Sequence, residues 1–256
     1  MDSAPDGRGA LARSLDLPRV IGHRGAAASA PENTLAGLRR AAALGVRWVE
    51  FDVKLTACGQ PVLMHDDTLE RTTNGFGRVA ETTLEELRRL DAGSWFDPAF
   101  AGERVPTFAE ALALAGELGL GVNVEIKPCP GREAETARVA TEALATLWPS
   151  DRPTPLVSSF APECLAVARE VAPELPRGLL CHRLPRTWRE LMERFGCRTL
   201  HVDQLFLSAR RVAEVKAEGV PLLAYTVNRA GRARRLFAWG LDAVFTDAPE
   251  VVAPEA

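Results

Sequence analysis

Short apolar runs of strand length alternate along this chain with longer amphipathic patterns of helical period. The strand-like runs lie at 19–25, 48–56, 121–127, 155–160, 177–181, 199–205, 221–227 and 242–247. Several of the intervening helical patterns end in glycine directly before the next run, which is the usual joint between a helix and a strand. This alternation is typical of a parallel sheet covered by helices, and the count of eight runs favours an α/β fold of the (β/α)8 TIM-barrel type over a doubly wound sheet.

One segment interrupts the alternation directly after the second run. Residues 66–104 are too long for an ordinary connection, and they carry turn signals and a capping-box pattern at Thr83 and Glu86. We therefore expect a TIM barrel with an inserted segment after the second strand. The predicted organisation is a flexible N-terminal tail at 1–18 and a single barrel domain at 19–256 that contains the insertion.

The composition of the chain limits the kinds of binding partner and the cellular compartment to be expected. The 256 residues are 46% apolar, enough for a large core, and the net charge of −3 gives no basic footprint for nucleic acid. No apolar stretch approaches the ~20 residues that span a bilayer, so we expect no stable membrane anchoring. The five cysteines are odd in number and scattered, which indicates neither a disulfide framework nor a thiolate zinc site. We expect a cytoplasmic protein; the sequence does not indicate its oligomeric state.

Carboxylates occupy two of the predicted strands. Glu50 and Asp52 lie in WVEFDVKLT and Glu125 lies in GVNVEIK, and alternation places Glu50 and Asp52 on one face. Taken alone, such a pair is more often matched with nearby arginines than with a metal. In a barrel, however, the carboxyl ends of the strands converge on one rim. Three oxygen donors without cysteine suit one hard divalent ion, Mg²⁺ or Ca²⁺.

Two histidines and two cations follow strand-like runs at the same predicted rim. His23 and Arg24 lie at the end of the first run, His65 precedes the insertion, and Lys127 follows Glu125 at the end of the third run. Arginine offers a planar fork for phosphate oxygens, and lysine offers a compact point charge. Cleavage of a phosphodiester needs a base for the attacking oxygen and an acid for the leaving alkoxide, and two histidines can supply both. The sequence leaves open which histidine is the acid.

Other aromatic and histidine residues carry weaker signals. Trp95 and Phe96 in the insertion could equally be packing residues or the floor of a pocket for a glycerol or acyl group. His182 and His201 match no motif, and we interpret each as a surface or core histidine.

Taken in order along the chain, the motifs resemble the glycerophosphodiester phosphodiesterase family. They are HRG at 23–25, PENT at 31–34, ExD at 50–52, HD at 65–66 and ExK at 125–127. The similarity extends from about residue 19 to 250 and includes YTVN at 225–228 and FTDAPE at 245–250. No single motif is specific, but their ordered combination is.

This resemblance implies a barrel with an insertion at 66–104 and a role for each residue named above. The implied roles are metal ligation by Glu50, Asp52 and Glu125, acid/base catalysis by His23 and His65, phosphate contact by Arg24 and Lys127, and a place close to the metal shell for Glu32. The chain departs from the family pattern at two positions. Cys58 replaces a usual aspartate in a turn, and Tyr225 replaces a usual tryptophan, which could reshape the wall of the substrate pocket.

The predicted function is metal-dependent hydrolysis of small glycerophosphodiesters, such as glycerophosphocholine or glycerophosphoethanolamine, to glycerol 3-phosphate and an alcohol. Our mechanistic hypothesis is attack of the glycerol 2-hydroxyl on phosphorus, giving a cyclic phosphate that water then opens. Two alternatives are a lysophospholipase D-type activity on lysophospholipids and a non-catalytic phosphodiester-binding protein. Degenerate members would be expected to lose a ligand or a histidine, and this chain retains all of them.

Overall fold

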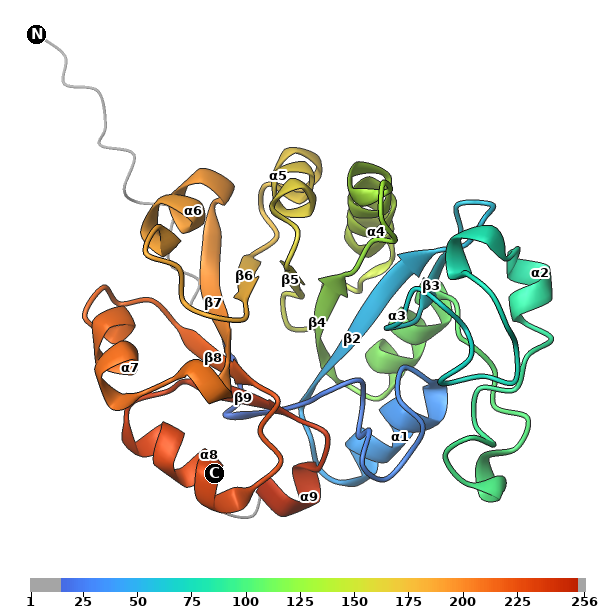
Figure 1. Ribbon diagram of the computed structural model, residues 1–256, viewed down its shortest axis with the longest axis horizontal. Helices are drawn as coiled ribbons and strands as arrows, with labels where there is room; N and C mark the ends of the chain where they lie inside the picture. The colour runs from blue at the N-terminus through green and yellow to red at the C-terminus, as the bar shows by residue number, and fades with distance from the viewer. Residues whose placement is uncertain (1–14, 253–256) are drawn as a thin grey trace, which may run out of the picture.

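Eight parallel strands close into a barrel in the computed structural model, which describes residues 15–252 (Figure 1). The barrel strands are β1 (Val20–Gly22), β2 (Trp48–Leu55), β4 (Gly121–Ile126), β5 (Leu156–Ser159), β6 (Arg177–Cys181), β7 (Cys197–Asp203), β8 (Leu222–Tyr225) and β9 (Ala243–Thr246). The ring closes because β1 pairs in parallel with both β2 and β9. The predicted (β/α)8 fold is confirmed.

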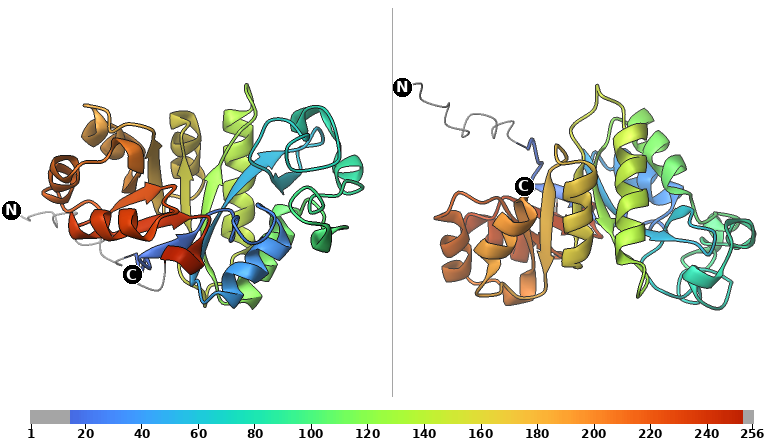
Figure 2. Two further views of the ribbon diagram at one scale, coloured as in Figure 1. Left: turned by 60° about the horizontal axis from the view of Figure 1, so that its bottom comes forward. Right: turned by 90° about the horizontal axis from the view of Figure 1, so that it is seen from above.

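Helices surround the strands on the outside of the ring (Figures 1 and 2). They are α1 (Leu35–Ala43), α3 (Phe108–Glu117), α4 (Glu133–Leu147), α5 (Pro162–Val171), α6 (Trp188–Phe195), α7 (Ala209–Lys216), α8 (Ala230–Ala238) and the short α9 (Pro249–Val252). Most of the segment expected to be a flexible tail, 1–18, lies outside the described residues. Its last residues are described, and Leu17 packs against the apolar cluster at one end of the barrel interior.

The barrel interior is apolar at one end and polar at the other. The apolar end is filled by Ile21, Trp48, Leu156, Leu223, Ala243 and Phe245. All eight residues of β2 are buried, because helices cover the outer face of a parallel barrel while side chains fill its interior. The polar side chains on the inner face lie toward the carboxyl ends of the strands, which is where sites form in this fold.

One short antiparallel strand was not predicted from the sequence. β3 (Pro61–Leu63) folds back on the end of β2, and Val53 is paired with Leu63 and Leu55 with Pro61. Three residues are too few to show a period of two, and proline marks an edge position without a ladder donor. The departure from the alternating pattern therefore begins before residue 66, with a hairpin, rather than at the predicted start of the insertion.

The insertion projects from the side of the barrel away from α6 and α7 (Figures 1 and 2). It contains η1 (Val79–Glu81), α2 (Leu84–Leu87) and η2 (Pro98–Phe100). The capping box expected at Thr83 and Glu86 is present at the start of α2. Buried apolar side chains join the insertion to β3 and to the loop after β4, namely Val62, Met64, Leu69, Val79, Leu87, Ala92, Val105 and Cys129.

Candidate active site and metal centre

Adjacent strands bring the three predicted carboxylates together. β2 and β4 pair in parallel with Asp52 opposite Glu125, so that Glu50, Asp52 and Glu125 share the inner face at the carboxyl end of the sheet. Each offers a carboxylate oxygen within 4.8 Å of the others. All three are buried, at 3%, 1% and 8% of their full exposure.

Burial and mutual repulsion disturb the ionisation of this cluster. Burial first, and then the charge of Asp52, raise the pKa of Glu125 to about 7 and the pKa of Glu50 well above its usual range. Asp52 behaves differently: burial opposes its ionisation, but Arg24 and Lys127 hold its pKa at about 2. Arg24 and Lys127 therefore stabilise the ionised form of one carboxylate, that of Asp52. An additional positive charge at the cluster would stabilise the ionised forms of Glu50 and Glu125 as well.

Arg24 and Lys127 supply the positive charge nearest to the carboxylates. Lys127 Nζ lies 3.1 Å from Glu125 Oε1 and 3.5 Å from Asp52 Oδ1. Arg24 Nε lies 3.3 Å from Asp52 Oδ2, and the Arg24 backbone N–H donates to Glu50 Oε2 at 3.0 Å. Both cations thus lie where a phosphate group held at the cluster would reach them.

The loop after β1 owes its shape to close packing against α1. Arg24 and Asn33 have positive φ angles of 52° and 55°. Gly25 (φ 91°) packs so tightly that an added Cβ would lie 2.6 Å from the carbonyl carbon of Gly37 in α1. Asn33, which the sequence analysis did not single out, donates from Nδ2 to Asp52 Oδ2 at 2.9 Å and accepts the Asp52 backbone N–H at 3.1 Å.

His23 is held by a carboxylate from the other end of the chain. Its Nδ1 lies 2.6 Å from Oδ1 of Asp247, which follows β9, and Asn228 Nδ2 donates to the other oxygen of Asp247 at 2.6 Å. An ionised carboxylate only accepts, so Nδ1 carries the proton. Nε2 is left free and lies 3.8 Å from Glu50 Oε2, facing the acidic cluster.

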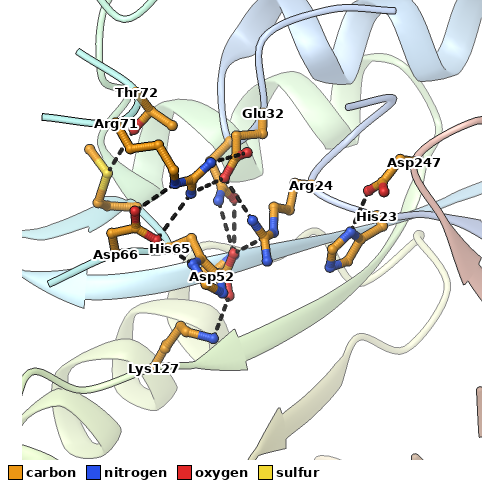
Figure 3. A network of polar contacts seen from close by, with 12 residues as sticks. His23, Arg24, Glu32, Asp52, His65, Asp66, Arg71, Thr72, Lys127 and Asp247 are labelled. Carbon is orange, nitrogen blue, oxygen red and sulfur yellow. Dashed lines mark hydrogen bonds and ion pairs between the residues drawn. The ribbon is translucent and has the colours of Figure 1, made fainter. Parts of the chain in front are cut away.

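His65 is held by its chain neighbour in a network of ion pairs (Figure 3). Its Nδ1 lies 2.6 Å from Oδ1 of Asp66, and Arg71 binds Asp66 from Nε at 2.6 Å. Arg71 also contacts both oxygens of Glu32, at 2.7 and 2.8 Å, and Glu32 accepts from Arg24 at 2.8 Å. Glu32 therefore contacts arginines rather than the acidic cluster itself.

The aromatic pocket residues divide into two groups. Tyr225 and Phe160 line the same cavity as His23 and Glu125, with their rings edge to face at 5.7 Å. The exposed His182 stacks on Phe160 at 4.8 Å. In the insertion, Trp95, Phe96 and Phe100 pack against one another, and none of them lines that cavity.

The acidic cluster fits a divalent cation. Glu50 Oε1 is buried and has no hydrogen-bond partner within residues 15–252, which is costly for a polar atom unless a cation or donor meets it. Burial, followed by the charge of Asp52, raises the pKa values of Glu50 and Glu125, and a bound cation would favour the ionised form of both carboxylates. Oxygen donors alone suit Mg²⁺ or Ca²⁺.

Partners of the predicted residues were the main omission of the sequence analysis. Asp247, Asn33, Asp66 and Arg71 each hold a predicted residue in place. The first three lie inside motifs that were noticed, FTDAPE, PENT and HD, so position within those motifs was an available signal. Arg71 lies in the insertion, and no pattern pointed to it.

Comparison with known proteins decides the family. A sequence profile of the glycerophosphoryl diester phosphodiesterase family matches residues 23–251. The chain belongs to this family. It is 37% identical over 238 residues to a glycerophosphodiester phosphodiesterase of Caldanaerobacter subterraneus subsp. tengcongensis, covering 91% of this chain and 95% of that protein. It is also 30% identical over 254 residues to a glycerophosphodiester phosphodiesterase of Bacillus subtilis, covering 93% and 86%.

A solved structure of another protein agrees closely with this fold. It is an Oleispira antarctica phosphodiesterase in complex with the product sn-glycerol-3-phosphate, which superposes with a TM-score of 0.91 at 44% identity and covers 93% of this chain and 96% of that one. The predictions that the chain is an enzyme and belongs to the glycerophosphodiester phosphodiesterase family are confirmed. Within residues 15–252, no helix is both long and apolar enough to cross a membrane.

Proposed function

We propose that this enzyme hydrolyses glycerophosphodiesters to glycerol 3-phosphate and an alcohol, with one divalent cation held by Glu50, Asp52 and Glu125. The observation that carries the proposal is the buried cluster of these three carboxylates beside Arg24 and Lys127. The similar Oleispira antarctica phosphodiesterase was solved with sn-glycerol-3-phosphate, which supports the same product for this chain. Bound at the cluster, the cation would polarise the phosphoryl group.

The chain's own residues would bind and orient the phosphate. Arg24 and Lys127 lie on either side of Asp52 and present donors toward the acidic cluster. A phosphate anion there would exchange part of their contact with the carboxylates for contact with its own oxygens. Most of the Arg24 side chain and all three carboxylates are withdrawn from water, which strengthens these electrostatic interactions.

His23 and His65 would move the protons. In each, a carboxylate holds the Nδ1 proton and leaves Nε2 as the free ring nitrogen. We propose that the glycerol 2-hydroxyl attacks phosphorus and that one histidine, neutral and without a proton on Nε2, accepts the hydroxyl proton there. The other histidine, protonated on both ring nitrogens, donates its Nε2 proton to the leaving alkoxide. Water then opens the cyclic phosphate, with the two histidines in exchanged roles.

The test of this function is release of glycerol 3-phosphate from glycerophosphocholine by metal-stripped protein. Addition of Mg²⁺ or Ca²⁺ should restore turnover, and EDTA should abolish it. Trapping of a cyclic glycerol phosphate would support attack by the 2-hydroxyl. Solvent ¹⁸O incorporation with a single inversion at phosphorus would contradict that step. Binding of glycerophosphocholine without turnover in the presence of either metal would favour the non-catalytic alternative.

A second substrate class has one observation in its favour. A groove of about 660 Å³ lies beside the site and is lined by Asn228, the partner of Asp247. Its other lining residues are the apolar Leu205, Leu207 and Val227 and the polar or charged Gln204, Thr226, Arg229 and Arg232. Such a groove exceeds what a choline or ethanolamine group fills, so lysophospholipids belong in the same assay. Faster release from a lysophospholipid than from glycerophosphocholine would establish the lysophospholipase D-type alternative.

We propose the cytoplasm as the site of action. All five cysteines are free thiols in the structure, as is usual in a reducing compartment. Cell fractionation with a tagged full-length chain would test this location.

A further inference from the structure

Polar side chains continue into the barrel interior beyond the carboxylate cluster. Asn123 on β4 lies opposite Glu50 in the strand register and donates from Nδ2 to Ser158 Oγ at 2.9 Å. On β7, Thr199 Oγ1 and His201 Nε2 lie 2.9 Å apart. These residues are almost completely withdrawn from solvent, and the imidazole of His201 has an exposed fraction of 0%. The proposed reaction described above uses none of them.

Three buried polar atoms in this region have no hydrogen-bond partner among residues 15–252. They are Glu50 Oε1, Asn123 Oδ1 and His201 Nδ1. Their residues come from three different strands and line one cavity of about 30 Å³. Unpaired buried polar atoms are costly and rare in folded proteins. Three of them around one cavity therefore indicate a common partner.

A cation alone does not account for all three atoms. It would account for Glu50 Oε1, because Glu50 belongs to the cluster whose ligand atoms lie within 4.8 Å of one another. His201 lies outside that cluster. If the Thr199 hydroxyl donates to Nε2, the proton of the imidazole lies on Nδ1, which is a donor and not a ligand atom.

One water molecule within hydrogen-bond distance of all three atoms would satisfy them at once. It would accept the Nδ1–H of His201 and donate its two hydrogens to Glu50 Oε1 and Asn123 Oδ1. A cavity needs about 10–15 Å³ for a water and two to four polar partners, and this cavity offers about 30 Å³ and three partners. A carboxylate oxygen has two lone pairs, so Glu50 Oε1 can accept this hydrogen bond and still face a cation.

We propose that His201 is a positioning residue that fixes the Glu50 carboxylate through a buried water shared with Asn123. The proposal rests on the proposed role of Glu50 as a metal ligand. Its second oxygen, Oε2, already receives the backbone N–H of Arg24 at 3.0 Å. The water would fix the first oxygen, so that both oxygens are oriented before a cation arrives.

The barrel is shaped around a neutral imidazole at this position. Gly178 on the neighbouring strand β6 leaves space for the ring, since a Cβ there would lie 2.7 Å from His201 Cε1. Burial lowers the pKa of His201 to about 3, so the ring stays uncharged across the physiological range. A neutral ring carries its one proton on Nδ1 when the Thr199 hydroxyl donates to Nε2.

The test compares two replacements of His201 by their affinity for Mn²⁺, measured calorimetrically on metal-stripped full-length protein. His201→Leu removes the donor, and we expect Mn²⁺ binding to weaken by about 10- to 100-fold, as for other outer-shell partners. His201→Asn keeps a donor at the Nδ1 position and should bind Mn²⁺ within about threefold of wild type. As a control, Leu200→Ala on the opposite face of β7 should lower the melting temperature and leave Mn²⁺ affinity unchanged.

The outcomes separate this inference from the proposed function. Wild-type protein that binds no Mn²⁺ and releases no glycerol 3-phosphate would overturn both. Wild-type binding with undiminished affinity in His201→Leu, or with equal weakening in the Asn variant, would overturn only the role of His201. Should His201→Leu fail to fold, a high-resolution crystal structure of the wild type decides: solvent density within hydrogen-bond distance of all three atoms supports the proposal, and its absence where other buried waters are resolved overturns it.

Discussion

The two histidines of the site have the same chemistry and different support. His23 follows a barrel strand, and its carboxylate partner Asp247 follows the neighbouring strand β9, 224 residues away in sequence. His65 lies between β3 and the insertion, and its partner is the next residue, Asp66. We call these the barrel half and the insertion half of the site.

The barrel half is fixed by strand pairing, and the insertion half is fixed by ion pairs. Backbone hydrogen bonds continue the sheet up to His23, whose N–H donates to Thr246 O at 2.8 Å. In the insertion half, Arg71 joins Asp66 to Glu32 but is itself exposed to solvent. Exposed ion pairs contribute little and weaken with salt. A histidine of this site can thus be held through strand pairing or through ion pairs at the surface.

Removal of either imidazole should have the largest effect on turnover. His23→Ala and His65→Ala should each lower kcat by on the order of 10²–10⁴, because each would transfer a proton in the reaction. Steady-state assays of glycerol 3-phosphate release would measure this, with thermal melting to show that both variants fold. Near-native turnover in both variants would refute the acid/base assignment. Loss of turnover in only one variant would mean that only that histidine transfers a proton.

Replacement of Asp247 and of Asp66 by asparagine should lower kcat to different extents, and so distinguish the barrel half from the insertion half. Asp247 accepts one hydrogen bond at each oxygen, from His23 and from Asn228, so an amide cannot satisfy both donors. We expect Asp247→Asn to lower kcat by up to about 10²-fold. Asp66 also accepts at both oxygens, from His65 and from Arg71; we expect Asp66→Asn to have a smaller effect, because the amide oxygen can still accept from His65 while Arg71 keeps its contacts with Glu32. Equal losses in kcat from the two variants would mean that the insertion half is as rigid as the barrel half.

The sequence was informative about the barrel half because strand patterns carry it. Eight apolar runs predicted the ring, and alternation along the second run placed Glu50 and Asp52 on one face, as observed. The barrel fold then implied that the site residues meet at the carboxyl ends of the strands. The pairing of His23 with Asp247 was not predicted, because it depends on which strand ends become neighbours when the ring closes.

Insertion geometry was harder to predict from the sequence. The three-residue β3 was missed because it is too short to show a period, and Arg71 was missed because an exposed arginine has no sequence signature. The unpaired nitrogen of His201 depends on packing between three strands, and sequence reasoning could offer only a surface or core histidine there.

Loss of the Arg71 side chain should have a moderate effect confined to the insertion half. Arg71→Met breaks the contacts to Asp66 and Glu32, and an exposed ion pair contributes roughly 0.2–1 kcal/mol. The two ion pairs together contribute up to about 2 kcal/mol, so we expect kcat/KM to fall by less than about 30-fold. Wild-type activity measured from low to high salt should approach that of the variant, whereas salt-independent activity would show that these ion pairs do not hold His65.

A substitution at the outer end of the insertion should have the smallest effect on activity and stability. Such a result would show that the insertion half of the site does not extend to this loop. Phe76 is 84% exposed, within a loop whose neighbour Gly77 donates its N–H to Glu70. Phe76→Ser should change the free energy of unfolding by less than about 0.5 kcal/mol, as is usual for a surface position, and should leave kcat/KM for glycerophosphocholine unchanged. Denaturant unfolding and the same assay measure both quantities.

A selective loss of activity toward a lysophospholipid in this variant would instead place the outer loop against the acyl chain, because an exposed aromatic ring has apolar surface to offer such a substrate. The insertion would then contribute to substrate choice as well as to the position of His65.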